Sequence, residues 1–495
     1  MKRDKVKQRE GILVSPHERL SESQVKLVDE VSRELLEDPG LICPNKQAVK
    51  LFKDAGARIA ETDEGPKVSI PSSLIDKSLK TAPSTVVLGA RDPDNKLILD
   101  AHEPRVRFGS GSETNVWLEV DFDNGKPQFV RKDGSMELLK KAAHLAENLE
   151  HLDFFIRCVN MRDDFITVDN KDVNMFSLCL NNIGKHVQAG ITNIDRLDDV
   201  IKIGEIVAGG KERFEKNPVL SFITCIIKSP FQIVDDTTDK FIEISKRRVP
   251  IVISSSPMGG ATAPFDEFGM VAQINAELLA GVALNQLVAP EAPILYGAVP
   301  VRTRLDNLRD MYGAPEFNHY NIDCAQMARH YGIPCYSTAG VGDASVPGIQ
   351  ATVEKILTLL SVPASGAQYI HYAFGLLERT AVFCPEQAVM DNEHIGLVKY
   401  ALEDPNVFPE EKEKILKLIR KVMGTRHKAF INYLPLPSKQ AVYARYPLED
   451  DENGALGAAN TKYKNIMEKQ RNNLPAEVQN EIRAKIEDIL PETFN

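Results

Sequence analysis

The segment IVISSSPMGGATAPFDEFGMVAQINAELLAGVALNQLVAPEAPILYGA (residues 251–298) contains the pattern that decides the fold. Two short apolar runs, 251–255 and 294–298, flank a longer stretch of helical character at 268–284. A short run that is apolar throughout is typical of a strand buried on both faces, and a helix between two such runs is typical of a crossover connection. The segment therefore predicts one β-strand–helix–β-strand unit of a parallel sheet.

The same unit repeats along the middle of the chain, with strand starts 31–43 residues apart. The expected strands are 153–159, 186–191, 220–225, 251–255, 294–298, 335–338 and 369–372, with an eighth near 381–390. The expected helices between them are 198–206, 238–246, 268–284, 322–331 and 349–360. So many consecutive units favour an α/β fold of the closed (β/α)8 or TIM-barrel type. An open, doubly wound sheet is the alternative.

The barrel pattern predicts three parts of the chain. Residues 1–134 form a helical extension with short strands, 135–395 form the barrel core, and 396–495 form a C-terminal helical extension packed on the barrel. Within the first part, Ser21 and Gln24 form a capping box for a helix that Asp38-Pro39-Gly40 ends. A Pro-rich bridge at 433–438 interrupts the last part.

Composition narrows the class of protein. The chain has 495 residues, with 60 basic and 70 acidic side chains and a net charge of −10, which argues against a nucleic-acid partner. The charged N-terminus lacks the apolar core of a signal peptide, and no apolar run is long enough to span a membrane. The seven cysteines form no CxxC pair, as in a cytoplasmic protein with reduced thiols. We therefore expect a cytoplasmic enzyme.

The loops after the strands should carry the chemistry, because active sites of barrels lie at the carboxyl ends of the strands. These loops contain no nucleophile elbow, HExxH motif, P-loop or His/Cys cluster at metal spacing, so no metal is expected on this chain. A zinc site assembled from distant residues stays open as an alternative. The stretch STAGVGDAS (337–345) is a second alternative, a cradle of backbone amides for a phosphate.

Aromatic side chains are the more informative feature of these loops. Those expected at or near the mouth of the barrel are Phe108, Tyr296, Tyr312, Tyr372 and Phe374, together with His371. These rings either pack the rim or form a cage for a quaternary ammonium group, which aromatic faces attract. Arg302 and Arg304 follow the fifth strand and are candidates for binding a carboxylate, or else are solvated surface residues.

Seven motifs resemble those of the trimethylamine methyltransferase family over almost the whole chain. They are ELLEDPGL (34–41), TAPSTVVLGARD (81–92), FGSG (108–111), INAELLAGVALNQLVAPEAPILYG (274–297), HYGIPCY (330–336), GDASVPGIQATVEK (342–355) and LLERTAVFCPEQAVMDNE (376–393). The resemblance implies a TIM barrel that demethylates a methylated amine and passes the methyl group to the corrinoid (cobalamin) of a cognate partner protein. Apart from the resemblance, we expect a soluble chain that forms a homo-oligomer.

The resemblance breaks at one position. Gly340 aligns with the pyrrolysine of the archaeal trimethylamine enzymes, as in the branch that lacks pyrrolysine, of which glycine betaine methyltransferases are the best-known group. A quaternary ammonium is already activated, because it leaves as a neutral tertiary amine without any proton transfer. The expected reaction is therefore methyl transfer from a quaternary amine, glycine betaine first among them, to cobalt(I).

The resemblance and the loop positions together give a set of expected substrate-binding residues and no acid–base pair. The set is Phe108, Lys228, Tyr296, Glu316, Gly340, Asp343, His371, Tyr372 and Phe374. Gly340 is expected to leave open the space that pyrrolysine fills elsewhere. Asp343 could instead cap a helix, and Glu316 could order a loop. Two rival functions remain: a non-catalytic barrel that binds quaternary amines, and a lyase or isomerase acting on a phosphorylated substrate.

Overall fold

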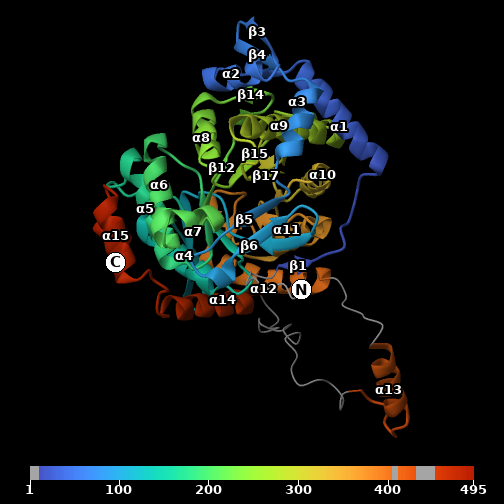
Figure 1. Cartoon of the computed structure of the whole chain (residues 1–495). Helices are drawn as coiled ribbons and strands as arrows, with labels where there is room; N and C mark the ends of the chain where they lie inside the picture. Colours follow the sequence, from blue (N-terminus) through green and yellow to red (C-terminus); the bar gives the residue numbers. More distant parts are fainter. Residues whose placement is uncertain (1–10, 404–410, 431–451, 495) are drawn as a thin grey trace.

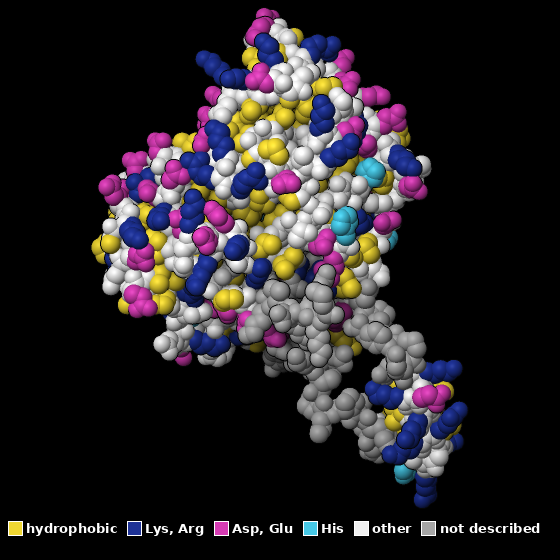
Figure 2. Space-filling view, viewed as in Figure 1, with side chains coloured by type: hydrophobic (Ala, Val, Ile, Leu, Met, Phe, Trp, Pro, Cys, Tyr) yellow, Lys and Arg dark blue, Asp and Glu magenta, His cyan; other side chains and the backbone are white. Residues whose placement is uncertain are grey.

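The computed structural model describes residues 11–403, 411–430 and 452–494 (Figure 1). A central sheet is surrounded by helices, and further small sheets and helices lie on the outside (Figure 1). Lys and Arg are interspersed with Asp and Glu over the face in Figure 2, and basic side chains crowd helix α13. The predicted Pro-rich bridge at 433–438 lies outside the described residues.

The centre of the fold is a curled, mostly parallel sheet of nine strands in the order β1-β7-β21-β20-β17-β15-β12-β11-β10. Its strands are β1 (Ile12–Leu13), β7 (Arg105–Phe108), β10 (Phe154–Ile156), β11 (His186–Ala189), β12 (Leu220–Thr224), β15 (Ile251–Ser255), β17 (Ile294–Ala298), β20 (Cys335–Thr338) and β21 (Tyr369–His371). Only β1 runs antiparallel to its neighbour. All seven strands predicted with the parallel pattern are present.

The two ends of this sheet approach each other. Gly109, just after β7, forms a parallel bridge with Phe154 of β10. The Asp153 amide donates to the Phe108 carbonyl over 2.6 Å, and the Phe108 amide donates to the Asp153 carboxylate over 2.9 Å. β7 and β10 are thus connected by hydrogen bonds at the point where β7 ends.

The prediction of an eighth strand near 381–390 is wrong. Residues Val382–Phe383 (β23) belong to a separate four-stranded sheet, and helix α12 begins at Pro385. Proline at a first helical position is favourable because its missing N–H has no partner there in any case. The eighth parallel strand is β7, which lies within the predicted N-terminal extension.

Helices cover the outside of the sheet. They are α4 (Met136–Asn148), α5 (Val168–Asn182), α6 (Leu197–Ala208), α7 (Lys211–Lys216), α8 (Asp235–Lys246), α9 (Glu267–Val288), α10 (Pro315–Tyr331), α11 (Ile349–Ser361) and α12 (Pro385–Leu402). All five helices predicted between the strands are present, although α10 begins seven residues earlier than expected. Each lies between two consecutive parallel strands, as crossover connections require.

Helix α9 is long and apolar enough to cross a membrane by length and composition alone, but 89% of its apolar window is buried inside the protein. It packs against α1, α3, α8 and α10 as well as strands β15 and β17. Its composition therefore reflects burial on all sides within the protein core.

The N-terminal region lies outside the parallel sheet, apart from β1 and β7. It contains α1 (Glu22–Glu37), β2 (Leu41–Ile42), α2 (Lys46–Asp54), β3 (Arg58–Thr62), β4 (Gly65–Ser69), α3 (Ser72–Thr81), β5 (Thr85–Leu88), β6 (Leu97–Asp100), β8 (Val116–Asp123) and β9 (Lys126–Asp133). The predicted capping box at Ser21 and Gln24 is confirmed. The β5–β6 hairpin crosses the front of the molecule in Figure 1.

Short strands after the parallel strands shape the loops. They are β13 (Ile227–Lys228), β14 (Gln232–Ile233), β16 (Met258–Gly259), β18 (Val301–Thr303), β19 (Asp310–Met311), β22 (Leu376–Leu377) and β23 (Val382–Phe383). The C-terminal helices are α13 (Glu411–Met423), α14 (Glu452–Met467) and α15 (Ala476–Lys485). Helix α14 packs on α12 and α4, and α15 packs on α6.

Candidate active site

The register of the parallel strands decides which side chains face the inside of the curled sheet. Tyr369 of β21 and Phe154 of β10 lie on opposite sides of β7, and their rings stack with centroids 3.6 Å apart. Because the rings meet across the intervening strand, both point to the inside of the curled sheet. Tyr336 is in register with Tyr369, and Gly297 with Tyr336. Neighbours in register on parallel strands share a face. The inner face therefore carries Tyr369 and Tyr336 and, two residues further along each strand, His371 and Thr338.

His371 is the centre of a neutral hydrogen-bond network at the carboxyl ends of β20 and β21. Its Nδ1 lies 3.0 Å from the Tyr336 hydroxyl, and its Nε2 lies 2.6 Å from Thr338 Oγ1. Thr338 donates its single proton to the Ala298 carbonyl over 3.1 Å. Thr338 must therefore accept from His371 Nε2–H, which leaves Nδ1 to accept the Tyr336 hydroxyl proton.

Burial lowers the pKa of His371 well below its usual value. The imidazole is therefore neutral at physiological pH, in agreement with the tautomer that the network requires. Its ring is stacked against Tyr336 with centroids 4.1 Å apart and lies 3.8 Å from the ring of Tyr372. These three side chains form one continuous aromatic wall, which we call the mouth wall.

Tyr372 has an unusual backbone conformation, with a φ of 67°. A left-handed backbone at a bulky residue costs energy and persists only where the surroundings impose it. Here Gly111 lies against the Tyr372 ring, since a Cβ at Gly111 would lie 2.5 Å from Tyr372 Cδ1. Ser112, also at positive φ, donates to the Thr380 carbonyl over 3.1 Å. The loop after β7 thus fixes the outer end of the mouth wall.

The mouth is open to solvent beside β12. Cys225 immediately follows β12 and continues the inward-facing positions Ser221 and Ile223. It is an exposed residue. The protein groups packed around its thiol nevertheless raise the thiol pKa by partial burial. At the rim, Glu113 forms an ion pair with buried Arg157. A Cβ at Gly190, the position after β11, would lie 3.7 Å from the Glu113 carboxylate. The opening therefore has one carboxylate at its edge.

A buried ion pair supports the loops after β20 and β21. Lys355 of α11 and Asp391 of α12 are fully buried and lie 2.9 Å apart. Lys355 donates to the Gly340 carbonyl over 2.5 Å, and Asp391 accepts from the Gly375 amide over 2.8 Å. Burial acts to raise the pKa of Asp391, but Lys355 and the other partners of the carboxylate lower it by more. The pKa of Asp391 is therefore below its usual value. The pair connects both loops that border the mouth wall.

A second buried carboxylate supports the loops after β12 and β15. Glu277 of α9 accepts from Ser229 over 2.7 Å, from Ser255 over 2.5 Å and from the Phe231 amide over 3.2 Å. Gln273 donates to its other side over 3.1 Å. Burial raises the pKa of Glu277 in spite of these four donors. Its hydrogen bonds are all used within the protein, so its role is to hold the loops.

Comparison with known proteins agrees with this arrangement of a curled parallel sheet and a site at its carboxyl end. The sequence model of the trimethylamine methyltransferase (MTTB) family matches residues 4–429. The chain belongs to this family. It is therefore a methyltransferase, and the resemblance seen in its motifs is confirmed.

Relatives within the trimethylamine methyltransferase family include proteins with two different substrates in their names. A trimethylamine methyltransferase of Desulfitobacterium hafniense is 29% identical over 392 residues, 79% of this chain and 76% of the relative. That of Methanosarcina barkeri is 29% identical over 386 residues, covering 77% and 75%. A glycine betaine methyltransferase of D. hafniense is 24% identical over 395 residues, 79% of each chain.

Two of the residues expected to bind substrate face away from the mouth of this family member. Tyr296 points outward from β17, where its hydroxyl donates to Asn275 of α9 over 2.6 Å and its ring lies 6.2 Å from Tyr331 of α10. Phe108 also points outward, with Lys399 of α12 lying 5.5 Å from its ring centroid. Both are buried between the sheet and the helices, so neither forms part of the mouth wall.

Gly340 does not leave the open space that was expected. Its φ is +80°, and a Cβ at this position would lie 2.6 Å from Ala373 Cα. The Gly340 amide donates to Thr358 over 2.8 Å, and its carbonyl accepts from Lys355. The loop is pulled against the backbone after β21 and against α11, so glycine here permits close backbone packing and not a cavity.

Asp343 orders a loop and is not a helix cap. Its carboxylate accepts the amides of Tyr312 and Gly313 over 2.9 and 3.0 Å, whereas the cap of α11 is Gly348. Burial raises the pKa of Asp343 although these two bonds oppose the shift. Glu316 lies in the first turn of α10, where its carboxylate is 3.8 Å from Arg302 and 33% exposed.

The remaining expected residues differ in exposure. Lys228 is exposed, three residues beyond Cys225, whereas Phe374 is buried in the core. Arg302 packs over the Phe265 ring and bonds the Tyr320 hydroxyl over 3.1 Å, while Arg304 pairs with Asp306 at the surface. Neither arginine lies in the mouth wall. His371 and Tyr372 are the two expected residues that do.

The phosphate-cradle reading of 337–345 does not fit the structure. The amides of Asp343 and Ala344 already donate to the Glu354 carboxylate, over 2.6 and 3.1 Å. A phosphate would have to displace that carboxylate and would meet its negative charge. Among the described residues, no group of three or more His, Cys, Asp or Glu side chains is placed to hold a metal ion.

The structure adds four residues to the site that sequence reasoning missed: Glu113, Cys225, Tyr336 and Thr338. The signal for Tyr336 and Thr338 was available in the alternation of the strand CYST (335–338) with the neighbouring YIHY (369–372). Fixing His371 as inward would have placed both on the inner face. No pattern in the sequence indicates Glu113, because the loop that carries it has no regular structure.

Proposed function

We propose that this family member transfers a methyl group from a quaternary amine, glycine betaine in the first instance, to the corrinoid of a cognate partner protein. The observation that carries the proposal is the neutral mouth wall of Tyr336, His371 and Tyr372 beside an opening to solvent. The wall offers aromatic faces and contains no acid–base pair. A substrate that is already cationic and fully alkylated suits such a site.

Aromatic faces and one carboxylate account for binding of the ammonium group. Each ring that faces the cation contributes about 0.5–2 kcal/mol. Because burial keeps His371 neutral, its ring adds to the wall without repelling a cation. Glu113 at the rim supplies a negative charge that Arg157 partly offsets. This balance binds the cation weakly enough for its charge to disappear during methyl transfer.

The chemical step needs no proton transfer. One C–N bond breaks, both electrons of that bond stay on nitrogen, and the product leaves as a neutral tertiary amine. The corrinoid of the partner supplies the strongly nucleophilic cobalt that accepts the methyl group. The residues of this chain therefore bind the amine, exclude its other orientations and aim one methyl group outward, with the reacting atoms about 3–3.5 Å apart.

The opening at Cys225 fits such a partner, because a group on another protein must reach the methyl carbon from outside. Lys228 is exposed on the same loop and is our candidate for binding the carboxylate of a betaine. We expect Lys228→Gln to raise the KM for glycine betaine about tenfold, since a charge-assisted hydrogen bond contributes about 1.5–3 kcal/mol. The KM for choline, which lacks the carboxylate, should be unchanged; an equal rise for both would contradict this role.

We also propose that the curled sheet is a (β/α)8 barrel closed by β7 beside β10. The Gly109–Phe154 bridge and the two hydrogen bonds between Phe108 and Asp153 support closure. In this arrangement the barrel core takes its first strand from the segment before residue 135. The extension up to 134 and, in the described part of the C-terminal extension, helices α14 and α15 pack around that core, whereas α13 lies apart from it (Figure 1).

The outer face of α11 supports the expected homo-oligomer. Ile349, Val353, Leu357 and Leu360 are 36–68% exposed and lie along one side of the helix. A groove of about 500 Å³ runs beside them, lined in part by Phe129 and Leu456. Contiguous exposed apolar surface of this kind is typical of a contact with another subunit. We propose that a second copy of this chain covers it, in a cytoplasm that keeps the seven free cysteines reduced.

Light scattering after size exclusion tests the subunit contact. Val353→Glu should yield monomers, because it places a charge in the apolar stripe. Gln350→Glu adds the same charge on the same helix outside the stripe and should leave the oligomer intact. Identical masses for both variants would show that the α11 face is not the contact.

The methyl-transfer assay tests the function. The protein is mixed with a reduced corrinoid protein and glycine betaine, and the corrinoid absorbance and the release of dimethylglycine by NMR are followed together. We expect both signals with glycine betaine and neither with trimethylamine. Turnover of trimethylamine alone would overturn the substrate assignment. Saturable binding of quaternary amines, with no methyl transfer to any of several corrinoid proteins, would favour a non-catalytic binding protein.

A further inference from the structure

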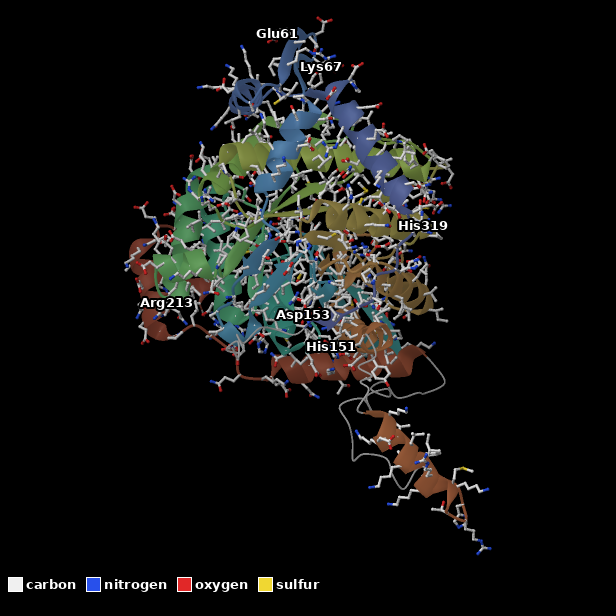
Figure 3. All side chains as sticks on the ribbon, turned by 45° about the vertical axis from the view of Figure 1, so that its right-hand side comes forward. Glu61, Lys67, His151, Asp153, Arg213 and His319 are labelled. Atoms are coloured by element: carbon white, nitrogen blue, oxygen red, sulfur yellow. The ribbon has the colours of Figure 1, made fainter. Side chains whose placement is uncertain are left out.

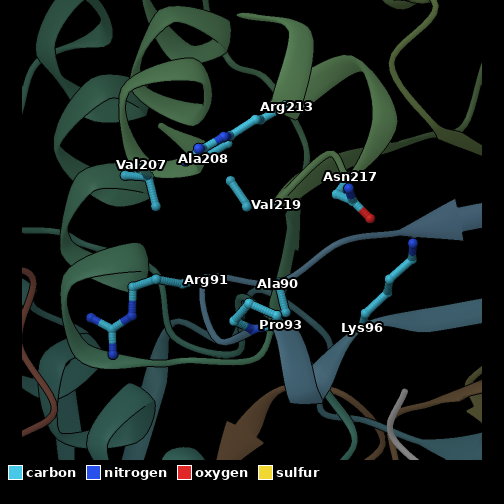
Figure 4. A pocket seen from close by; sticks show the side chains of 9 residues that line it. All are labelled: Ala90, Arg91, Pro93, Lys96, Val207, Ala208, Arg213, Asn217 and Val219. Carbon is cyan, nitrogen blue, oxygen red and sulfur yellow. The ribbon is translucent and has the colours of Figure 1, made fainter. Parts of the chain in front are cut away.

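A cavity of about 560 Å³ lies at the amino end of the parallel sheet, opposite the mouth. The loop of the β5–β6 hairpin, the end of α6, helix α7 and the residues before β12 form its walls (Figure 4). The lining residues are Ala90, Arg91, Pro93, Lys96, Val207, Ala208, Arg213, Asn217 and Val219. Nothing in the methyl-transfer mechanism uses this cavity.

Three of the nine lining residues are basic and none is acidic. In the described ranges, neither Lys96 nor Arg213 forms an ion pair with a carboxylate. Burial lowers the pKa of Lys96, and no opposing charge offsets this shift. Keeping the charge of Lys96 partly buried without a countercharge costs free energy. In a chain of net charge −10, such a cluster indicates a function.

Arg91 has a different part in the cavity wall. Its guanidinium donates to the carbonyls of Asn181 over 3.0 Å and Asn472 over 2.5 Å, and in Figure 4 it turns away from the cavity. Lys96 extends toward Asn217 from one side, and Arg213 reaches toward Ala208 from the other (Figure 4). Lys96 and Arg213 are therefore the two cations available to a ligand, with the Asn217 amide near Lys96.

The rest of the lining is apolar and comes from Ala90, Pro93, Val207, Ala208 and Val219. We propose that this cavity binds a small organic anion, with a phosphate or carboxylate group at Lys96 and Asn217 and an apolar body that extends along Val219 toward Val207 and Arg213. The volume is in the range of cavities that enclose small organic ligands. An inorganic ion alone would leave the apolar wall unused.

The cavity is separate from the mouth. Val219 immediately precedes β12, whose other end leads to Cys225 in the mouth. Figure 3 shows Arg213 on the side of the molecule opposite His319, which lies near the start of α10 and hence near the carboxyl end of the sheet. A bound anion should therefore not compete with the amine substrate.

Isothermal titration calorimetry with four probes tests the site: phenyl phosphate, benzoate, inorganic phosphate and benzyl alcohol. We expect phenyl phosphate and benzoate to bind with one site per chain, and benzyl alcohol not to bind. The variant Lys96→Gln should weaken binding of phenyl phosphate about tenfold, as the loss of one charge-assisted contact predicts. The same titrations at raised salt should show weaker binding.

The matched control is Lys211→Gln, which removes the same charge from α7 outside the cavity lining. It should change the affinity less than twofold, and both variants should keep the methyl-transfer activity of the unaltered protein. Binding of benzyl alcohol as tight as that of phenyl phosphate, or equal losses in both variants, would overturn the proposal. So would inorganic phosphate binding as tightly as phenyl phosphate, because the apolar body would then contribute nothing.

Discussion

The two ends of the parallel sheet differ in whether their positively charged side chains are paired with carboxylates. At the mouth, Lys355 is fully buried but pairs with Asp391, and burial keeps His371 of the mouth wall neutral. At the amino end, Lys96 and Arg213 face a cavity without any carboxylate in its lining. This difference underlies our proposals that one end binds a cation and the other an anion.

This difference shows how the same fold separates two kinds of recognition. Parallel strands bring the residues that follow them to one end and those that precede them to the other. A cation can be held mainly by aromatic faces, whereas an anion requires cations that are not already neutralised. The paired Lys355 supports loops at the mouth, whereas Lys96, without a carboxylate partner, is available to a ligand at the amino end, and four changes test this comparison.

The largest expected effect follows from breaking the paired cation. Lys355→Met leaves the Asp391 carboxylate buried without its paired cation, which costs about 3–5 kcal/mol of unfolding free energy. Urea unfolding measures the loss. Lys355→Met/Asp391→Leu removes both charges and should recover more than half of it. A loss below about 1 kcal/mol in the single variant would show that the pair is not structurally important.

The second effect compares the buried histidines of the two ends as pH falls. Burial lowers the pKa of His371 at the mouth and lowers that of His186 at the amino end to about 4. In the unfolded chain each histidine has a pKa of about 6.5. Below that pH each one takes up a proton on unfolding, so the unfolding free energy falls as the pH falls through about 6.5. Between pH 6.5 and 5, His186→Gln should remove about 1.5 kcal/mol of that loss. Urea midpoints at both pH values measure it, and an unchanged pH slope would contradict it.

The third effect concerns the cation site at the mouth. Tyr372→Leu removes one aromatic face and should raise the KM for the quaternary amine about tenfold, within the range of a desolvated cation–π contact. Tyr372→Phe keeps the ring and should restore the KM to within about threefold. If leucine and phenylalanine gave the same KM, the ring would have no part in binding the cation.

The smallest effect should come from the unpaired cation. Lys96→Gln removes a charge that has no carboxylate partner, so the unfolding free energy should change by less than about 0.5 kcal/mol or rise slightly. Urea unfolding in phosphate-free buffer, beside Lys355→Met, measures the contrast between the two lysines. A loss comparable to that of Lys355→Met would show that Lys96 has a structural partner.

Strands that are apolar throughout could be predicted from the sequence, but the strand beside β10 could not. RVRF (105–108) alternates arginine with apolar residues, so it lacks the run that marks a doubly buried strand. Arg107 faces the interior near Asp153, 46 residues further along the chain. A local sequence pattern cannot show that these two residues come close together. The run AVFCP (381–385) does contain a short strand, β23, but that strand belongs to a separate sheet, and the proline of the run begins a helix.

The site could be predicted in part for a related reason. Its location at the carboxyl ends follows from the fold, and His371 and Tyr372 follow from their position after β21. Tyr296 and Tyr336 have similar local sequences, and only the register shows that the first faces the helices and the second faces the interior. The conformation at Gly340 depends on Lys355, Thr358 and Ala373, which local sequence reasoning cannot bring together.

Strand β7 also imposes an order on synthesis of the chain. Arg107 pairs with Tyr369, so one edge of β7 has no partner until about 260 further residues have left the ribosome, roughly 13–50 s at ordinary rates of translation. Its other edge pairs with β1, which is made earlier, and can dock against Phe154 much sooner. A nascent chain would thus carry one unpaired sheet edge for about half of its synthesis, and such an edge is prone to pair with other chains.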